Sequence, residues 1–449
     1  MRQTLTRTAS RAALLALGLA LFAAAAPAAD WPGWRGPHRD GKSAETGLLP
    51  AWKNGGPPLA WRASGLGGGF SSLSVVGDRI YTMGDLDGKQ YVLALDRAHG
   101  KVVWKTAVGP AWVDEYGGPR GTPTVDGDRI YALSTEGELV CLRAANGEKV
   151  WSRSLSRDFG GKMMSVWKFS ESPLVHDGRV IVTPGARDAG LVALHPATGE
   201  EIWRTKLPEL GPEGKDGAAY SSVVVSNGAG VEQYVQVTGR GAIGVEAATG
   251  RYLWGYNRIA NEVANIPTPL VDGDDVFVST GYGTGAALLK LVKTGSGVEA
   301  REVYFLPGET FQNHHGNMVL HGGHVYAGSG HNKGFPMSVE LADGAIAWGP
   351  VRNDGQGSAA VTFADGRLYM RYQNGLMVLV EATPEAYRER GSFEIPEVSH
   401  PSWSHPVIAG GKLYLREQDH LFVYDVSASA TATAGQASTV RSRPSRLAR

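Results

Sequence analysis

The sequence contains one cysteine, Cys141, among its 449 residues. A lone thiol excludes an internal disulfide, a zinc or iron–sulfur site built from several thiolates, and a Cys-x-x-Cys-His attachment site for haem. The chain also lacks an excess of either charge, because 44 Lys and Arg balance 44 Asp and Glu. Nucleic acids and anionic membranes are bound by basic surfaces, so the charge balance argues against both as partners.

Turn-forming and aromatic residues are abundant. The chain has 61 Gly, 24 Pro, 12 Trp and 16 Tyr, and 42% of its residues are hydrophobic. This composition is too hydrophobic for a disordered chain and too rich in turn formers for a helical bundle, so it predicts an all-β fold. The length is roughly three times that of a common single domain, which leaves several domains or one repeat array.

The N-terminal 29 residues have the pattern of a secretory signal peptide. Arg2, Arg7 and Arg11 precede an apolar run over residues 12–25, and small residues follow at 26–29. We therefore expect a Sec-type signal at 1–29 and a secreted or periplasmic protein without a membrane span after cleavage. The alternative is an uncleaved anchor, but the apolar run is short for a span. No cysteine lies near the cleavage site for lipid attachment.

A repeated unit accounts for most of the remaining chain. Its first half, a strand, a Gly/Asp turn and a second strand, is clearest at residues 75–81, 125–131 and 175–181. Its second half is a further pair of strands that ends in tryptophan, as at Trp104, Trp151, Trp203, Trp254 and Trp348. The first four tryptophans are 47, 52 and 51 residues apart, and the last gap of 94 residues holds one degenerate unit. Four short strands per such period are typical of a β-propeller blade.

The innermost strands count to eight, near Ser72, Thr122, Ser172, Ser222, Thr268, Asn317, Ala360 and Pro406. The eighth unit ends at its third strand, residues 421–425, and the missing strand is predicted at 57–61 near the N-terminus. This closure joins both ends of the ring and removes the free sheet edges. We predict an eight-bladed propeller of four-stranded antiparallel blades over residues 59–426, with a leader at 30–58 and a disordered tail at 427–449; two smaller β domains are the alternative.

The signature Ala-Leu-Asp-x-x-x-Gly-Lys-x-x-Trp at residues 94–104, echoed at 193–203, resembles the repeat of secreted bacterial pyrroloquinoline-quinone-like (PQQ-like) β-propellers. The opening Trp-Pro-Gly-Trp-Arg-Gly-Pro at 31–37 is similar to the leader of such proteins. The resemblance implies a fold shared by quinoprotein alcohol dehydrogenases and by the lipoprotein scaffold of the outer-membrane β-barrel assembly machine. Because the repeat is common to enzymes and scaffolds, it leaves the function open.

The resemblance also raises the question of a cofactor. Quinoprotein dehydrogenases hold PQQ with a vicinal disulfide, a tryptophan and Ca²⁺, and a chain with one cysteine does not form that disulfide. We therefore expect no cofactor; PQQ with Ca²⁺, whose electrons would leave to a separate acceptor, is the alternative. The scaffold lipoprotein binds no cofactor, and this chain lacks its N-terminal lipidated cysteine.

The residues that enter the innermost strands are expected to ring one mouth of the central channel. The predicted ligand-binding residues are Trp112, Asp114, Tyr116, Arg120, Trp167, Glu171, Tyr220, Asn265, Asn313, His314, His315, Gln356, Trp403 and His405. This mixture suits a polar organic ligand that is oriented by Arg120 and Glu171. Glu171, His315 and Arg120 are the candidates for catalysis. The alternative is that these groups pair with one another and with water inside the channel.

Five histidines lie close together in sequence, at 314, 315, 321, 324 and 331. A strand separates His314 and His315 from the turn that carries His321 and His324, so we expect no metal site. The leading hypothesis is a binding or scaffolding module that uses the channel mouth for a polar small molecule, a glycan or an extracytoplasmic protein, and we expect a monomer. The alternative is a quinoprotein-type oxidoreductase, or another carbohydrate-active enzyme, with its site at the same mouth.

Overall fold

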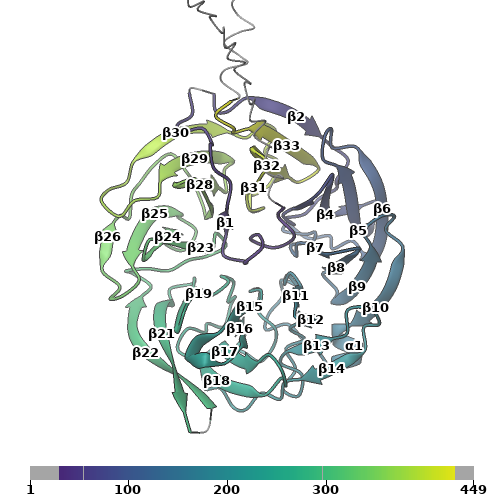
Figure 1. Ribbon diagram of the computed structural model, residues 1–449, viewed down its shortest axis with the longest axis vertical. Coiled ribbons are helices and arrows are strands. Elements are labelled where there is room, and N and C mark those ends of the chain that lie inside the picture. Colours follow the sequence, from purple (N-terminus) through teal and green to yellow (C-terminus); the bar gives the residue numbers. More distant parts are fainter. Residues whose placement is uncertain (1–29, 54, 296, 430–449) are drawn as a thin grey trace, which may run out of the picture.

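The computed structural model describes residues 30–53, 55–295 and 297–429. The predicted signal peptide and most of the predicted tail, residues 430–449, lie outside the described residues. Within them, eight sheets stand around a central axis (Figure 1), which confirms the eight-bladed propeller. The described part contains no helix long and apolar enough to cross a bilayer.

Each of the first four blades is made of four consecutive antiparallel strands. Blade one has β3 (Ser74–Val76), β4 (Arg79–Leu86), β5 (Lys89–Asp96) and β6 (Val102–Pro110), and blade two has β7 (Thr124–Asp126), β8 (Arg129–Leu133), β9 (Glu138–Arg143) and β10 (Lys149–Ser154). Blade three has β11 (Leu174–His176), β12 (Arg179–Val182), β13 (Val192–Leu194) and β14 (Glu201–Arg204), and blade four has β15 (Val224–Ser226), β16 (Gln233–Thr238), β17 (Gly241–Glu246) and β18 (Tyr252–Tyr256). Two short helices, α1 (Leu155–Phe159) and η1 (Gly228–Gly230), lie in connections.

The later blades follow the same plan until the last. Blade five has β19 (Leu270–Asp272), β20 (Asp275–Thr280), β21 (Gly285–Thr294) and β22 (Gly297–Pro307), and blade six has β23 (Met318–His321), β24 (His324–Ser329), β25 (Phe335–Glu340) and β26 (Ile346–Trp348). Blade seven has β27 (Ala359–Ala364), β28 (Arg367–Tyr372), β29 (Leu376–Glu381) and β30 (Glu389–Glu394), and blade eight contributes β31 (Val407–Ala409), β32 (Lys412–Glu417) and β33 (His420–Asp425).

The fourth strand of blade eight comes from the N-terminal part of the chain, as predicted. Strand β2 (Leu59–Ala63) pairs antiparallel with β33, with Leu59 opposite Tyr424 and Ala63 opposite Leu421. The indole of Trp61 then lies against Gly100 of blade one, where an added Cβ would meet the ring at 2.5 Å. The last blade is therefore complete and linked to the first.

Neighbouring blades are joined by the tryptophans that end their outer strands. Trp104 Nε1 donates to the Ala144 carbonyl of the next blade over 3.1 Å, and its ring lies against Gly147, whose φ of +73° makes room in the turn. Trp151 and Trp203 make the equivalent bonds to Pro196 and Ala247. In the degenerate fifth unit Tyr304 takes this place: its hydroxyl donates to the Leu341 carbonyl over 2.9 Å.

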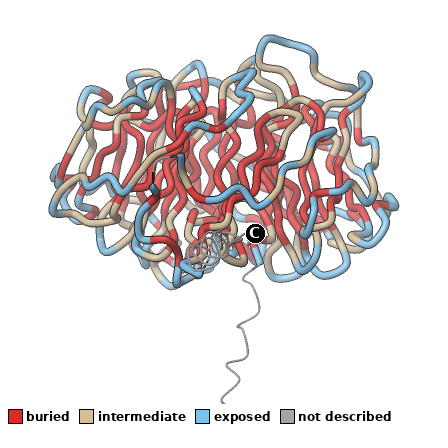
Figure 2. Tube along the Cα trace, turned by 90° about the horizontal axis from the view of Figure 1, so that it is seen from above, coloured by how far each residue is buried: buried red, intermediate tan, exposed pale blue. Residues whose placement is uncertain are grey.

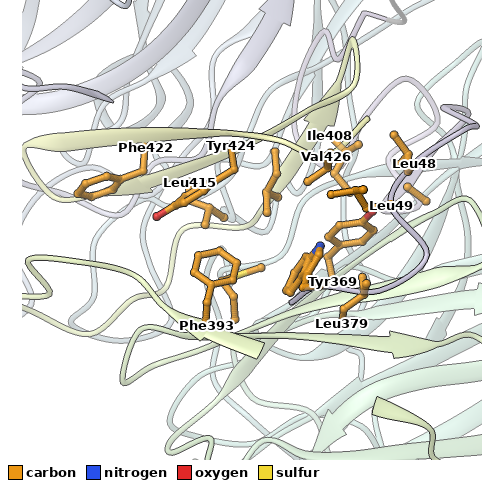
Figure 3. Packing of buried hydrophobic residues seen from close by; sticks show 14 of the residues in the cluster. Leu48, Leu49, Tyr369, Leu379, Phe393, Ile408, Leu415, Phe422, Tyr424 and Val426 are labelled. Atoms are coloured by element: carbon orange, nitrogen blue, oxygen red, sulfur yellow. The ribbon is translucent and has the colours of Figure 1, made fainter. Parts of the chain in front are cut away.

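The core is divided among the interfaces between blades. Figure 2 shows buried residues across the middle of the disc and exposed residues at its two loop faces. Leader residues enter one of these interfaces, because Leu48, Leu49 and Trp52 pack with Tyr369 of blade seven and residues of blade eight (Figure 3). The leader also adds a short strand, β1 (Lys42–Ser43), parallel to β27. It is thus an integral part of the ring.

Candidate functional site

A cavity of about 300 Å³ lies at one end of the central channel. Its wall takes residues from nearly every blade, because each innermost strand brings its first residues to the axis. Of the fourteen predicted site residues, eight line the cavity: Tyr116, Arg120, Trp167, Tyr220, His314, His315, Trp403 and His405. The remaining wall consists of Trp34, Phe70, Ser170, Ser172, Ser222, Ala264, Ile266, Tyr282, Asn317, Asn332 and Gln373. Ligand contact by any of them remains a prediction.

Six predicted site residues lie outside this wall. Asp114 and Gln356 are exposed at loops, and Trp112 lies under the Arg120 guanidinium. Asn265 and Asn313 are fully buried, and their amides donate to backbone carbonyls, among them Thr238 and Gly328 at 3.0 and 3.1 Å. These two amides hold strands and connections together in the structure.

Glu171 is the sixth, and it is buried beside the channel. Its carboxylate accepts hydrogen bonds from the Thr183 amide at 2.7 Å, the Thr183 hydroxyl at 2.8 Å and Gln236 Nε2 at 3.1 Å. Burial raises the pKa of Glu171 to about 7, against the opposing effects of the Thr183 hydrogen bonds and the Arg39 charge. Arg120 makes its hydrogen bonds elsewhere, so the expected joint orientation of a ligand by Arg120 and Glu171 has no support in this geometry.

Arg120 is the cationic group of the cavity wall. Its guanidinium lies 4.5 Å from the Trp112 ring centre and 5.4 Å from that of Phe70, and it donates to the Tyr116 and Trp167 carbonyls. Among the described residues no carboxylate forms an ion pair with Arg120, although the negative charge of Asp114 acts on its guanidinium and partly opposes the effect of burial on its pKa. Burial lowers the pKa of Arg120 to about 10, which leaves it charged at neutral pH.

Three histidines form a neutral part of the wall. The rings of His314 and His315 stack at 3.5 Å, and His314 contacts Ser358 Oγ at 2.9 Å and Tyr282 Oη at 3.1 Å. Burial lowers the pKa of His314 and of His405 to about 3, and lowers that of His315 well below its usual range. All three are therefore uncharged at neutral pH, and Arg120 carries the charge alone.

The leader forms the floor of the cavity. Trp34 Nε1 donates to Thr268 Oγ1 at 3.0 Å, and the Trp34 ring meets His405 edge-on at 4.6 Å. Two buried guanidiniums follow in the leader: Arg35 donates to the Met318 carbonyl, and Arg39 to the carbonyls of Ser172 and Pro173 at 2.6 and 2.9 Å. Figure 1 shows this N-terminal segment entering the centre of the ring.

A second cavity, of about 550 Å³, lies on the other side of the leader. Its wall includes leader residues from Pro37 to Lys42 and innermost-strand residues such as Leu174 and Leu320. Arg35 and Arg39 contact the carbonyls of Ser172, Pro173 and Met318. Along the innermost strands, these carbonyls lie where the residues that line the first cavity give way to those that line the second. The leader thus separates them, and the 300 Å³ cavity is closed at its inner end.

Several wall residues were missed because the prediction considered only the starts of the innermost strands and the loops that lead into them. Tyr282, Asn332 and Gln373 lie in connections between the second and third strands of their blades. These connections reach the same face as the starts of the innermost strands, so aligning them across blades would have found these residues. Trp34 lies in the leader, for which the repeat supplies no alignment.

The wall does not match the Ca²⁺ chemistry of a quinoprotein site. Ca²⁺ is held by several oxygen ligands that usually include carboxylates, whereas the residues lining this cavity include no Asp or Glu. No cluster of three or more His, Cys, Asp or Glu suited to a metal occurs in the described part of the chain. Cys141 is buried in β9. A dication beside Arg120 would be repelled by the guanidinium, and the cavity wall itself offers no carboxylate to compensate.

Comparison with known proteins agrees with the fold. A family model described as outer membrane protein assembly factor BamB matches residues 88–349. Proteins of that name from Xanthomonas campestris and Burkholderia pseudomallei are 28% and 27% identical over 106 and 267 residues, which are 24% and 51% of this chain and 25% and 67% of those proteins. Quinohemoprotein alcohol dehydrogenase ADH-IIG of Pseudomonas putida is 28% identical over 31% of this chain and 20% of its own length.

Solved structures show the same fold at low identity. BamB from Moraxella catarrhalis superposes with a TM-score of 0.55 at 11% identity, covering 82% of this chain and 97% of that one. Quinohemoprotein alcohol dehydrogenase ADHIIG from Pseudomonas putida HK5 gives 0.60 at 15% identity, covering 89% of this chain and 80% of that one. The assembly factor and the alcohol dehydrogenase are thus matched about equally well by the architecture.

Proposed function

The chain belongs to the family described as outer membrane protein assembly factor BamB, and we propose that it is an extracytoplasmic binding module whose partner enters the cavity at the channel mouth. The observation that carries this proposal is the cavity itself. It is closed at its inner end, walled by aromatic rings, and contains one guanidinium without a carboxylate partner among the described residues. Convergent polar groups in an apolar pocket are typical of a binding site.

The extracytoplasmic location rests on the predicted signal peptide at 1–29. The name of the curated relatives, which refers to outer-membrane protein assembly, agrees with it. The test is N-terminal sequencing of the protein recovered from a periplasmic or secreted fraction, which is expected to begin at or near Asp30. A chain that retains its first residues in the membrane fraction would contradict the proposal.

We propose further that the module works without PQQ, since the cavity wall lacks the carboxylates that a Ca²⁺–quinone site requires. The competing function is a quinoprotein-type oxidoreductase, and the likeness to the alcohol dehydrogenases favours it to the extent of the fold alone. The purified protein is incubated with PQQ and Ca²⁺ and desalted, and its absorbance and alcohol-dependent dye reduction are measured. We expect no stoichiometric quinone and no turnover; retained quinone with turnover would overturn the binding-module proposal.

A further inference from the structure

The shape of the 300 Å³ cavity limits what enters it. Trp34 lies at its inner end, and the buried Arg35 and Arg39 hold the leader to carbonyls at blades six and three. An extended polypeptide therefore has no path through the channel past the leader. The end of a chain, or a single side chain, is what such a closed cavity admits.

The charge of the cavity limits the occupant further. Arg120 is the one cation of the wall at neutral pH, and its hydrogen bonds go to backbone carbonyls. The wall contains no Asp or Glu. Guanidinium groups bind carboxylates with paired, charge-assisted hydrogen bonds. The group that this cavity lacks is therefore a carboxylate.

The wall around Arg120 is aromatic. Phe70 and Trp403 stand with their ring centres 4.7 Å apart, and Tyr116 lies 5.3 Å from Trp403 and 6.1 Å from Trp167. These rings offer contact area for an apolar or aromatic side chain rather than for a chain of hydroxyls. The carboxylate should thus be attached to an apolar body.

The loops around the cavity mouth form its rim and carry exposed valines beside charged residues such as Asp114 and Glu115. Val113 is 91% exposed and Val166 is 73% exposed, and Val263 and Val398 are exposed as well. All four lie in loops that lead into innermost strands at the mouth, whereas the other exposed large hydrophobic residues, Leu59, Val103, Ile202, Val303 and Ile346, lie on the outermost strands. A small carboxylic acid inside the cavity would leave the rim uncovered, but a polypeptide that continues outward would cover it.

We propose that the cavity receives the C-terminus of an extended polypeptide, with its α-carboxylate on Arg120 and its last, apolar side chain against Phe70, Tyr116 and Trp403. The residues before it lie across the valines of the rim. Capture of a terminal carboxylate is an established mode of peptide recognition. This inference rests on the proposed function, since it names the class of partner for the same cavity.

The test uses the fluorescence of the exported full-length protein, because Trp34, Trp167 and Trp403 line the cavity. Three probes are titrated: an acetylated hexapeptide that ends in leucine and phenylalanine with a free carboxylate, the same peptide amidated, and N-acetylphenylalanine. We expect the free acid to bind at least about tenfold more tightly than the amide, and about tenfold more tightly than N-acetylphenylalanine. Equal binding of acid and amide would overturn the inference.

The other outcomes separate the inference from the proposed function. N-acetylphenylalanine binding as tightly as the peptide would overturn the polypeptide partner while leaving a carboxylate-binding module. A fourth probe is an amidated peptide with an internal glutamate; if it binds as tightly as the free acid, it overturns the terminal carboxylate in the same way. If the protein retains PQQ and oxidises alcohol, the proposed function as a binding module is itself wrong.

Two variants locate the contacts. Arg120→Met should abolish the preference for the free acid, whereas Arg352→Met, whose guanidinium lies over Phe335 outside the cavity, should keep it. Because Arg120 also packs in the wall, a second variant changes only the rim. Val113→Ser combined with Val166→Ser should lower the affinity for the free-acid peptide several-fold and leave the affinity for N-acetylphenylalanine unchanged. Val103→Ser on β6 is its matched control. Unchanged peptide affinity in the double variant would contradict the rim contact.

Discussion

Trp34 Nε1 donates a hydrogen bond to Thr268 Oγ1 over 3.0 Å, across 234 residues of sequence. The bond ties the leader to the innermost end of blade five, while the edge of the same ring rests against His405 before blade eight. One side chain thus joins the N-terminal segment to two blades on different sides of the channel. The floor of the cavity depends on this contact.

Replacing Trp34 by alanine should lower the free energy of unfolding by about 2 kcal/mol, because it removes a partly buried ring and leaves a void. Urea unfolding followed by circular dichroism measures the change. Trp34→Phe keeps a ring against His405 and loses only the hydrogen bond, so about 1 kcal/mol is expected. If Trp34→Ala unfolds at the same urea concentration as the wild type, the leader does not stabilise the ring.

Removing the closing strand should destabilise the whole propeller. A chain that lacks residues 30–62 leaves β33 with an unpaired edge and removes Trp61 from Gly100. We expect the melting temperature in calorimetry to fall by roughly 10 °C or more. A chain truncated after Ser429, which keeps every strand of the described residues, is the control and should melt like the wild type. Equal melting of both would mean that closure by β2 contributes little.

The raised pKa of Glu171 predicts a specific pH dependence. A carboxyl whose pKa is about 7 when folded and near 4.5 when unfolded stabilises the protein below pH 4.5, and this contribution is lost as the pH rises through 7. The free energy of unfolding of the wild type, relative to Glu171→Gln, should therefore fall by about 2 kcal/mol between pH 5 and pH 8. Urea titrations at both pH values measure it.

The comparison with Glu171→Gln cancels other titrations. His314, His315 and His405 have lowered pKa values, so they weaken the fold as the pH falls below 6.5, but they do so equally in both proteins. Glu200→Gln, which replaces a carboxylate at an exposed turn, is measured in parallel as the control substitution. A flat difference between wild type and Glu171→Gln would mean that Glu171 is ionised in the folded protein throughout this range.

A buried ion pair links blades seven and eight. Arg371 Nη2 lies 2.6 Å from Glu417 Oε2, and the two side chains are 0% and 1% exposed. Glu417→Ala leaves a buried guanidinium without its carboxylate and should cost about 3–5 kcal/mol in urea unfolding, whereas Arg371→Met with Glu417→Leu should recover much of that loss.

The control for the buried pair is the exposed pair of Arg301 and Glu299 on β22, whose side chains are 58% and 52% exposed. Glu299→Ala should change the free energy of unfolding far less than Glu417→Ala does, because an exposed ion pair is solvated and contributes little. Similar losses for Glu299→Ala and Glu417→Ala would show that burial does not set the contribution of these pairs.

The blades were predictable because their contacts repeat at a fixed distance in sequence. A glycine such as Gly147 sits under the tryptophan of the preceding unit, so the period of the two residues reports the period of the fold. The closing strand followed from a count of strands. The exchange of tryptophan for Tyr304 in the fifth unit hid one repeat without changing the architecture.

The path of the leader was not predictable in the same way. Arg35 and Arg39 bind backbone carbonyls of Met318, Ser172 and Pro173, and a carbonyl is present at every residue whatever its side chain. No pattern in the sequence distinguishes these acceptors from any others. Asn265 and Asn313 were misjudged for the same reason. Their buried amides bind backbone carbonyls, but from the sequence they looked like polar groups available to a ligand.

The pairing of β2 with β33 also sets an order of events in time. The chain is synthesised from its N-terminus, so β2 and the leader are made first, yet their partners in blades five to eight are made last. Strand β2 therefore stays unpaired until the last hairpin, β32 and β33, has been made. Completion of the ring is therefore the final step of its folding, and until then the floor of the cavity is absent.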